Sequence, residues 1–178
     1  MTKEHLGGHC DITHIDEGVM NLAKKLGITT MLDIGCGPGG MVKKAREFDI
    51  LSEGIDGFPG KNMHEDIKII IHDFTIGKYN HENRFDLAWS CEFVEHVYEK
   101  YVPNFMNSFQ CCKYIFMTFA PSGTPGYHHV NCRSEDYWIK TFNDYGFDWD
   151  EALTLELRRA STMERDFVRK CGLAFCST

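Results

Sequence analysis

The stretch Leu32-Asp33-Ile34-Gly35-Cys36-Gly37-Pro38-Gly39-Gly40 decides the fold of this chain. A short apolar run, Thr29 to Ile34, leads into the glycines and predicts a buried strand, and the residues from Met41 to Phe48 predict a helix after them. Glycines let the backbone turn tightly and let a ligand come close to the main chain. Because a helix begins directly after the turn, its free N–H groups would face that ligand. The stretch therefore predicts a strand–loop–helix unit that binds a ligand at its turn.

The alternation of short apolar runs and longer helical patterns continues along the chain. β-branched and aromatic residues are concentrated in the short runs, which favours strands over helices there. The predicted strands are Thr29–Ile34, Ile50–Ile55, Ile67–His72, Phe85–Ser90, Tyr114–Phe119 and Leu173–Cys176, and the predicted helices are Ile15–Leu26, Met41–Phe48, Tyr98–Gln110, Ser134–Tyr145 and Glu151–Cys171. Strands that alternate with helices form right-handed parallel βαβ units. We therefore predict an α/β fold, a Rossmann-like three-layer sandwich with a mainly parallel sheet.

Length and composition limit the number of domains. The chain has 178 residues, which is enough for one domain and leaves no room for a separate substrate domain. Hydrophobic residues make up 43% and charged residues 25%, as in ordinary globular proteins. We expect residues 1–178 to form a single domain, with residues 1–16 as an N-terminal lid.

Charge and cysteine usage indicate the compartment and the partners. The formal net charge is −7, which argues against a protein that coats nucleic-acid phosphates. None of the eight cysteines forms a C-x-x-C pair, so free thiols in a reducing cytoplasm are the simplest interpretation. The N-terminus has no signal-peptide pattern, and no apolar run is long enough to cross a membrane.

The glycine loop fits two classes of ligand. Gly35, Gly37 and Gly40 match the dinucleotide pattern G-x-G-x-x-G, which would indicate an NAD-dependent oxidoreductase. Gly35, Gly37 and Gly39 instead match a pattern that begins with an acid, Asp33. That acid would repel a pyrophosphate but tolerate a cationic ligand.

The second pattern resembles motif I of the class I S-adenosylmethionine-dependent methyltransferases. The resemblance implies that Asp33 lies near the cationic methionine part of the cofactor and that the loop Gly35, Cys36, Gly37 and Gly39 encloses the methionine and ribose. It also implies roles for acids at two further strand ends. In Ile55-Asp56-Gly57 the acid would accept the ribose hydroxyls, and in His72-Asp73-Phe74 the acid and the next residue would hold the adenine.

Two later segments extend the resemblance. Phe85 to Val97, FDLAWSCEFVEHV, is similar to the strand-four segment of that family, which implies that Ser90, Cys91 and Glu92 lie near the methionine moiety. Gly126 to Trp138, GYHHVNCRSEDYW, resembles small stand-alone methyltransferases of bacterial and phage genomes. Together these matches predict a cytoplasmic methyltransferase that yields S-adenosylhomocysteine from a small-molecule acceptor.

Three histidines are candidates for a general base. His128 and His129 lie on a Gly- and Pro-rich loop after the predicted fifth strand, which places them at the ligand-binding edge. Either of them could instead pack or bond a loop carbonyl. His96 belongs to the Glu95-His96 pair and could act as the base or fix the start of the next helix.

The N-terminal segment is rich in histidine, with a cysteine at position 10 and histidines at positions 5, 9 and 14. Gly7 and Gly8 make a continuous helix improbable, so we expect no resident metal ion, and a zinc ion shared with His128, His129 or Cys132 is the alternative. We expect instead that the segment closes over the cofactor and that His9 and Asp11 line the site.

Other classes of protein stay open. Strand four is followed by Ser90-Cys91-Glu92-Phe93, which lacks the Pro-Pro motif that amino-methylating enzymes of DNA bases share. The chain has no Pro-Cys pair either, so a nucleic-acid acceptor is disfavoured. An NAD-dependent oxidoreductase and a non-catalytic S-adenosylmethionine-binding module remain as alternatives, and the oligomeric state is open.

Overall fold

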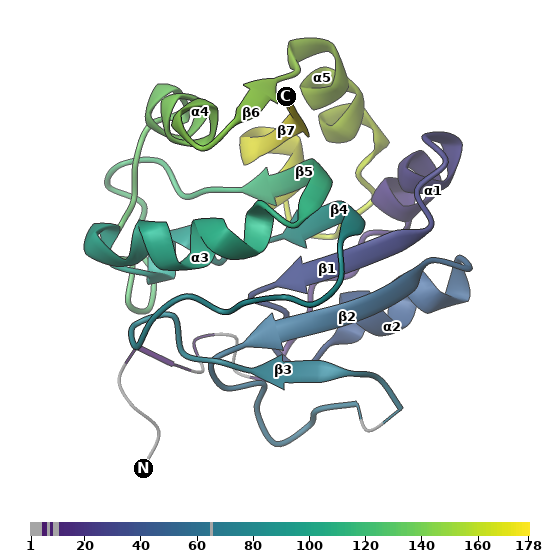
Figure 1. Ribbon diagram of the computed structural model, residues 1–178. Helices are drawn as coiled ribbons and strands as arrows, with labels where there is room; N and C mark the ends of the chain where they lie inside the picture. Colours follow the sequence, from purple (N-terminus) through teal and green to yellow (C-terminus); the bar gives the residue numbers. More distant parts are fainter. Residues whose placement is uncertain (1–4, 7, 9–10, 65) are drawn as a thin grey trace.

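The architecture is one seven-stranded sheet with helices on both faces (Figure 1). The computed structural model describes residues 5–6, 8, 11–64 and 66–178. The sheet order is β3-β2-β1-β4-β5-β7-β6. The strands are β1 (Thr30–Ile34), β2 (Leu51–Asp56), β3 (Ile69–Ile71), β4 (Phe85–Ser90), β5 (Cys112–Thr118), β6 (Phe147–Trp149) and β7 (Gly172–Ser177). β1 to β5 pair in parallel, whereas β7 runs antiparallel to both β5 and β6.

The helices are α1 (Glu17–Lys25), α2 (Gly40–Glu47), α3 (Val102–Phe109), α4 (Glu135–Asp144), α5 (Glu151–Ala160) and α6 (Phe167–Cys171), with short 3₁₀ turns η1 (Val94–His96) and η2 (Glu99–Tyr101). One core cluster joins α3 and α4 to the sheet, and a second joins α1, α2, α5 and α6 to it. The two clusters make the outer layers of a three-layer sandwich. The predicted α/β fold with a mainly parallel sheet is confirmed.

Two details of the predicted elements are wrong. The three-residue strand β6 was not expected, because it directly follows a helix and is too short for a periodic pattern. The predicted helix Glu151–Cys171 is two helices, α5 and α6, separated by residues 161–166.

Asp16 accounts for the break between α5 and α6. Its carboxylate caps α1 by accepting from Val19 N at 3.1 Å, and it also accepts from Thr162 N at 2.9 Å. The Ser161 hydroxyl donates to the other carboxylate oxygen. α1 also packs closely on this point, since a Cβ at Gly18 would lie 1.8 Å from the Ala160 carbonyl oxygen. The chain therefore leaves the helix at Ser161 because buried Asp16 binds the Ser161 hydroxyl and the Thr162 backbone N–H.

We expect Asp16→Ala to lower the free energy of unfolding by about 2–3 kcal/mol, since it removes a helix cap and leaves the buried Ser161 hydroxyl without its acceptor. Asp150→Ala is the matched control, because Asp150 caps α5 through Leu153 N at 2.8 Å and the loss should be about 1 kcal/mol. Urea unfolding followed by circular dichroism measures both values. Equal losses in the two variants would contradict the role of Asp16 as a link between helices.

The sequence also allows predictions about membrane spans and about the cysteines. Within the residues that the structure describes, no helix is long and apolar enough to cross a bilayer. The seven cysteines that the structure describes are free thiols.

Candidate functional site

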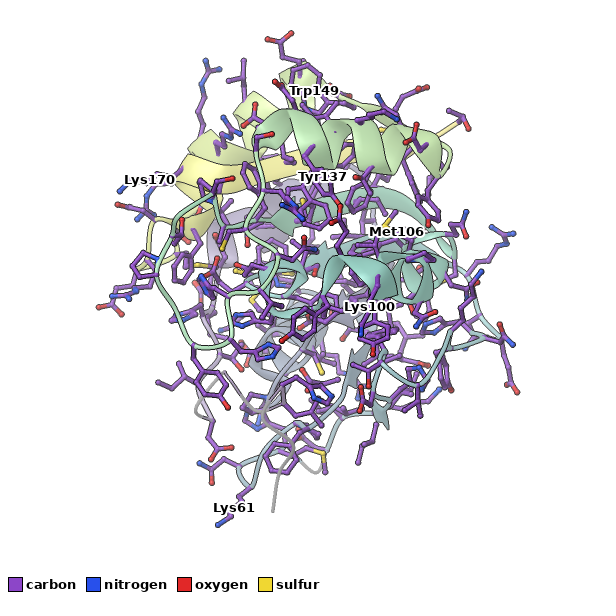
Figure 2. All side chains as sticks on the ribbon, turned by 90° about the vertical axis from the view of Figure 1, so that its left-hand side faces the viewer. Lys61, Lys100, Met106, Tyr137, Trp149 and Lys170 are labelled. Carbon is purple, nitrogen blue, oxygen red and sulfur yellow. The ribbon has the colours of Figure 1, made fainter. Side chains whose placement is uncertain are left out.

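A cavity of about 1170 Å³ opens at the carboxyl ends of the parallel strands. The arrowheads of β1 to β5 point to the left in Figure 1, and Figure 2 looks onto that side, with Trp149 of β6 and Lys61 of the loop after β2 at opposite ends of the view. Residues at the ends of these strands and in the loops that follow them line the cavity: Asp33, Gly35, Cys36, Gly37, Asp56, Gly57, Asp73, Phe74, Cys91, Glu92, His96 and His128. The topology thus brings most of the predicted site residues to one place.

The glycine loop forms the floor of the cavity between β1 and α2. Gly35 and Gly37 both have positive φ, 78° and 50°, which residues with side chains rarely adopt. A Cβ at Gly35 would lie 2.4 Å from the Phe93 ring, so glycine also permits close packing there. Gly39, in contrast, lies at the N-cap of α2 and packs against Ile67, and it does not line the cavity.

Asp33 is buried beneath this loop, with 2% of its surface exposed. Burial, and after it the charge of Asp56, raise the pKa of the Asp33 carboxyl well above its usual range. A cationic ligand in the cavity would lower that pKa again and offset the cost of burying a charge.

Asp56 supports the glycine loop directly. One carboxylate oxygen accepts from Gly37 N at 2.9 Å, and the other accepts from Phe58 N at 2.7 Å. A carboxylate has about four acceptor sites, so lone pairs remain for ligand hydroxyls. Asp56 is the last residue of β2 and lines the cavity.

Asp73 connects the third strand end to the N-terminal segment. Asp73 Oδ1 accepts from the Thr75 backbone and hydroxyl, while Oδ2 lies 3.1 Å from His5 Nε2. Leu6 covers Gly57, because a Cβ at Gly57 would lie 2.5 Å from the Leu6 side chain. The described part of the N-terminal segment therefore lies over the cavity.

The end of β4 carries backbone strain. Ser90 is buried and its hydroxyl donates to the Ile34 carbonyl at 2.9 Å, so it joins β4 to β1 and does not line the cavity. Glu92, two residues on, has a positive φ of 55° and does line the cavity. A non-glycine residue in that conformation costs about 1–3 kcal/mol and is typical of functional sites.

The three candidate histidines lie together but face different surroundings. His128 lines the cavity, has a positive φ of 49°, and its Nδ1 lies 3.0 Å from the His96 carbonyl oxygen. His96 also lines the cavity, and burial, then His129, lower its pKa to about 4. His129 packs edge-on against His96 at 4.9 Å between ring centroids and does not line the cavity.

Glu95 lies beneath these histidines, fully buried, at 0% exposure. Burial raises the pKa of Glu95 well above its usual range, and the neighbouring carboxylate of Glu92 raises it further. Glu92 is itself shifted upward by burial. The site therefore places two carboxyl groups side by side at the wall of the cavity.

Some expectations about the N-terminal segment differ from the structure, and one lies outside it. His9 falls outside the described residues. Asp11 accepts from Lys61 N at 3.0 Å and does not line the cavity. Thr13 lines it instead, and its hydroxyl accepts from Gly40 N at 3.2 Å, at the start of α2.

Sequence reasoning missed the wall that residues 162–167 contribute. Met163, Arg165 and Phe167 line the cavity, and the Phe167 ring packs edge-on against His14 at 5.1 Å between ring centroids. Burial, and then the charge of Arg165, lower the pKa of His14. The segment carries no motif, and long-range hydrogen bonds to Asp16 and to the Gly18 N–H hold it beside the site.

Similarity to known proteins exists at the level of structure. No protein-family model and no curated protein matches the sequence. The magnesium protoporphyrin IX methyltransferase of Synechocystis, solved with bound S-adenosylmethionine, superposes with a TM-score of 0.63 at 14% identity, over 91% of this chain and 77% of the other.

Two further structures superpose equally well. The 1,6-didemethyltoxoflavin N1-methyltransferase of Burkholderia thailandensis has a TM-score of 0.63 at 14% identity, over 90% of this chain and 76% of the other. A sugar N-methyltransferase of Streptoalloteichus has a TM-score of 0.64 at 8% identity, over 90% and 85%. This chain has the class I S-adenosylmethionine-dependent methyltransferase fold.

Proposed function

We propose that this protein transfers a methyl group from S-adenosylmethionine to a small-molecule acceptor. The observation that carries the proposal is the row of acids at consecutive strand ends, Asp33, Asp56 and Asp73, all lining one cavity beside a glycine loop. Acids in these positions suit a ligand that has cationic groups, ribose hydroxyls and an adenine amino group, and they repel a diphosphate. The fold's solved representatives, two of them methyltransferases of small molecules by name, support the same proposal.

The chain's own residues fit the cofactor. The turn Gly35-Cys36-Gly37 has no side chain at either glycine, so the main chain can approach a ligand closely. Asp56 keeps acceptor sites for ribose hydroxyls, Asp73 with Phe74 lies where adenine would bind, and Cys91 and Glu92 lie toward the methionine end. Bound S-adenosylmethionine would supply a methyl group already activated on a sulfonium.

The cavity also has room for an acceptor. Typical ligand pockets measure about 300–1,000 Å³, and this one, at about 1170 Å³, exceeds that range. Positioning and exclusion of water provide most of the catalysis in such a transfer. His5 and Leu6, from the proposed lid of residues 1–16, cover the adenine end, while Arg165 and the histidines border the rest.

His128 is the best placed of the candidate bases. Its Nδ1 is held at the His96 carbonyl, and the ring lines the cavity, so Nε2 keeps a lone pair for an acceptor proton. His96 touches the cavity too, but its pKa of about 4 makes it a weaker base at neutral pH. We therefore assign His128 as the base that removes the proton from acceptors that must lose one.

Calorimetry with S-adenosylhomocysteine and with NAD, followed by a screen of small hydroxyl and amine acceptors, tests the proposal. We expect micromolar binding of S-adenosylhomocysteine, no binding of NAD, and product formation with some acceptors. His128→Ala should keep the binding and slow turnover on those acceptors by at least about 100-fold, whereas His64→Ala should change neither.

Retention of NAD without binding of S-adenosylhomocysteine would refute the proposal in favour of an oxidoreductase. Cofactor binding with no turnover on any acceptor would indicate a non-catalytic binding module.

A further inference from the structure

Glu95, His96 and His129 form a compact cluster at the edge of the cavity. One carboxylate oxygen of Glu95 and one ring nitrogen of each histidine lie within 4.8 Å of one another. Two of these residues come from η1 and the third from the loop before α4, so the fold brings together positions more than thirty residues apart. The cluster borders the cavity, because His96 lines it whereas His129 and Glu95 do not.

Buried polar atoms in this cluster have no hydrogen-bonding partner among the described residues. Both carboxylate oxygens of Glu95 and Nδ1 of His96 are buried without one. Buried acids ordinarily accept several hydrogen bonds or coordinate a metal ion, because an uncompensated buried charge is very costly. Among the residues that the structure describes, no lysine or arginine forms an ion pair with Glu95, so a bound cation would supply the partner that its oxygens lack.

His129 is oriented as a metal ligand. Its Nδ1 lies 3.0 Å from the Thr124 carbonyl oxygen, an arrangement in which Nδ1–H donates and Nε2 keeps the lone pair. Metal-bound histidines have this second bond, which fixes the tautomer and the ring orientation. The ring packs against the backbone of Gly126, where a Cβ would lie 2.2 Å from Nε2, so only glycine at that position lets the ring take this orientation.

The loop that carries His129 is fixed to the rest of the cluster. The backbone N–H groups of Val130 and Asn131 both donate to the Glu95 carbonyl at 3.0 Å. Arg133 in turn forms an ion pair with Glu99 at 2.7 Å. The ligand groups are therefore held in place by the backbone before any ion binds.

The donor set selects the kind of ion. One carboxylate and two imidazoles suit Zn²⁺, Mn²⁺ or Fe²⁺, whereas Mg²⁺ and Ca²⁺ prefer oxygen donors alone. Donor atoms lie about 2.1 Å from such an ion, hence at most about 4.2 Å apart, so small side-chain rotations would close the cluster. Glu92, three residues before Glu95, lines the cavity, and its carboxylate is the candidate for a fourth donor.

We propose that Glu95, His96 and His129, with Glu92 as a fourth donor, bind one divalent first-row transition-metal ion at the wall of the cavity. The sequence alone predicts no resident metal, so the assignment comes from the tertiary structure. An ion there would face the cavity through Glu92 and His96 and leave coordination positions open for an oxygen of the acceptor. Binding of the ion needs only protein side chains and stands independently of methyl transfer.

Equilibrium dialysis of the purified full chain against Zn²⁺ or Mn²⁺ alone, followed by elemental analysis, tests the proposal. We expect about one ion per chain for the wild type. Glu95→Gln and His129→Gln should each weaken binding by more than about tenfold. His64→Gln, a histidine in the loop after β2, is the matched control and should keep one ion.

Two further readouts keep the test decisive. Thermal melts establish whether each variant folds. If Glu95→Gln does not fold, His129→Gln still tests the proposal, because His129 is less buried than Glu95. Calorimetry with S-adenosylhomocysteine should be unchanged in His129→Gln, which separates this proposal from the proposed function. Binding of less than about 0.1 ion per wild-type chain, or equal binding by the wild type and His129→Gln, would overturn the metal site.

Discussion

Asp56→Ala is expected to weaken the binding of S-adenosylhomocysteine by roughly 100-fold. A hydrogen bond to a charged group contributes about 1.5–3 kcal/mol, and tenfold in affinity corresponds to 1.4 kcal/mol, so the loss of two ribose contacts at the lower end of that range, about 3 kcal/mol, gives this magnitude. The variant also frees the Gly37 N–H, which Asp56 holds at 2.9 Å, and so loosens the loop around the ligand. Calorimetry measures the affinity directly.

Two comparison variants make the Asp56 result specific. Asp148→Ala, an exposed acid on β6 at the far edge of the sheet, removes the same charge and should leave the affinity unchanged. Asp56→Asn keeps an acceptor for Gly37 N–H and should fall between the wild type and Asp56→Ala. An affinity of Asp56→Ala within about threefold of the wild type would show that the end of β2 does not bind the ribose.

Gly35→Val is expected to lower the free energy of unfolding by about 4 kcal/mol and to abolish cofactor binding. The backbone at Gly35 has a φ of 78°, where a β-branched residue costs about 1–3 kcal/mol, and overpacking costs about 1–3 kcal/mol more. The overpacking arises because the new Cβ would lie 2.4 Å from the Phe93 ring. Phe93 lines the cavity, so its displacement also changes the shape of the site.

Gly27→Val separates the two contributions. Gly27 has nearly the same φ, 73°, but no atom lies within 4 Å of a Cβ built there. Gly27→Val should therefore lower the free energy of unfolding only by the backbone cost of about 1–3 kcal/mol. The variant should bind S-adenosylhomocysteine normally. Thermal melts measure the destabilisation, and calorimetry measures the affinity. Equal destabilisation of Gly35→Val and Gly27→Val would mean that the Phe93 ring moves aside without an energetic cost.

The parts of the fold that the sequence predicts are those with local signals. Glycines after an apolar run, and acids at or just after the ends of β2 and β3, can be predicted from the printed chain because strand and turn preferences act over a few residues. The same reasoning placed Asp33, Asp56 and Asp73 at one edge, since parallel strands end together. Their roles toward a cofactor stay predictions.

The parts that the sequence does not predict depend on distant contacts. The end of α5 is determined by Asp16, which lies 145 residues earlier than Ser161. The wall from Met163 to Phe167 reaches the cavity for the same reason. Glu95 reads as half of a common Glu-His pair, and only the tertiary structure shows that both its oxygens are buried without a hydrogen-bond partner among the described residues.

The position of β7 has a consequence for the order of folding. β7 follows β6 along the chain, yet it lies between β5 and β6 in the sheet, antiparallel to both. β6 therefore has no partner in the sheet until β7 has been synthesised, whereas β1 to β5 can already pair with one another. During translation the nascent domain would expose the edge of β5, and such unpaired edges invite aggregation. Synthesis of the last strand thus closes the edge and completes the sheet in a single step.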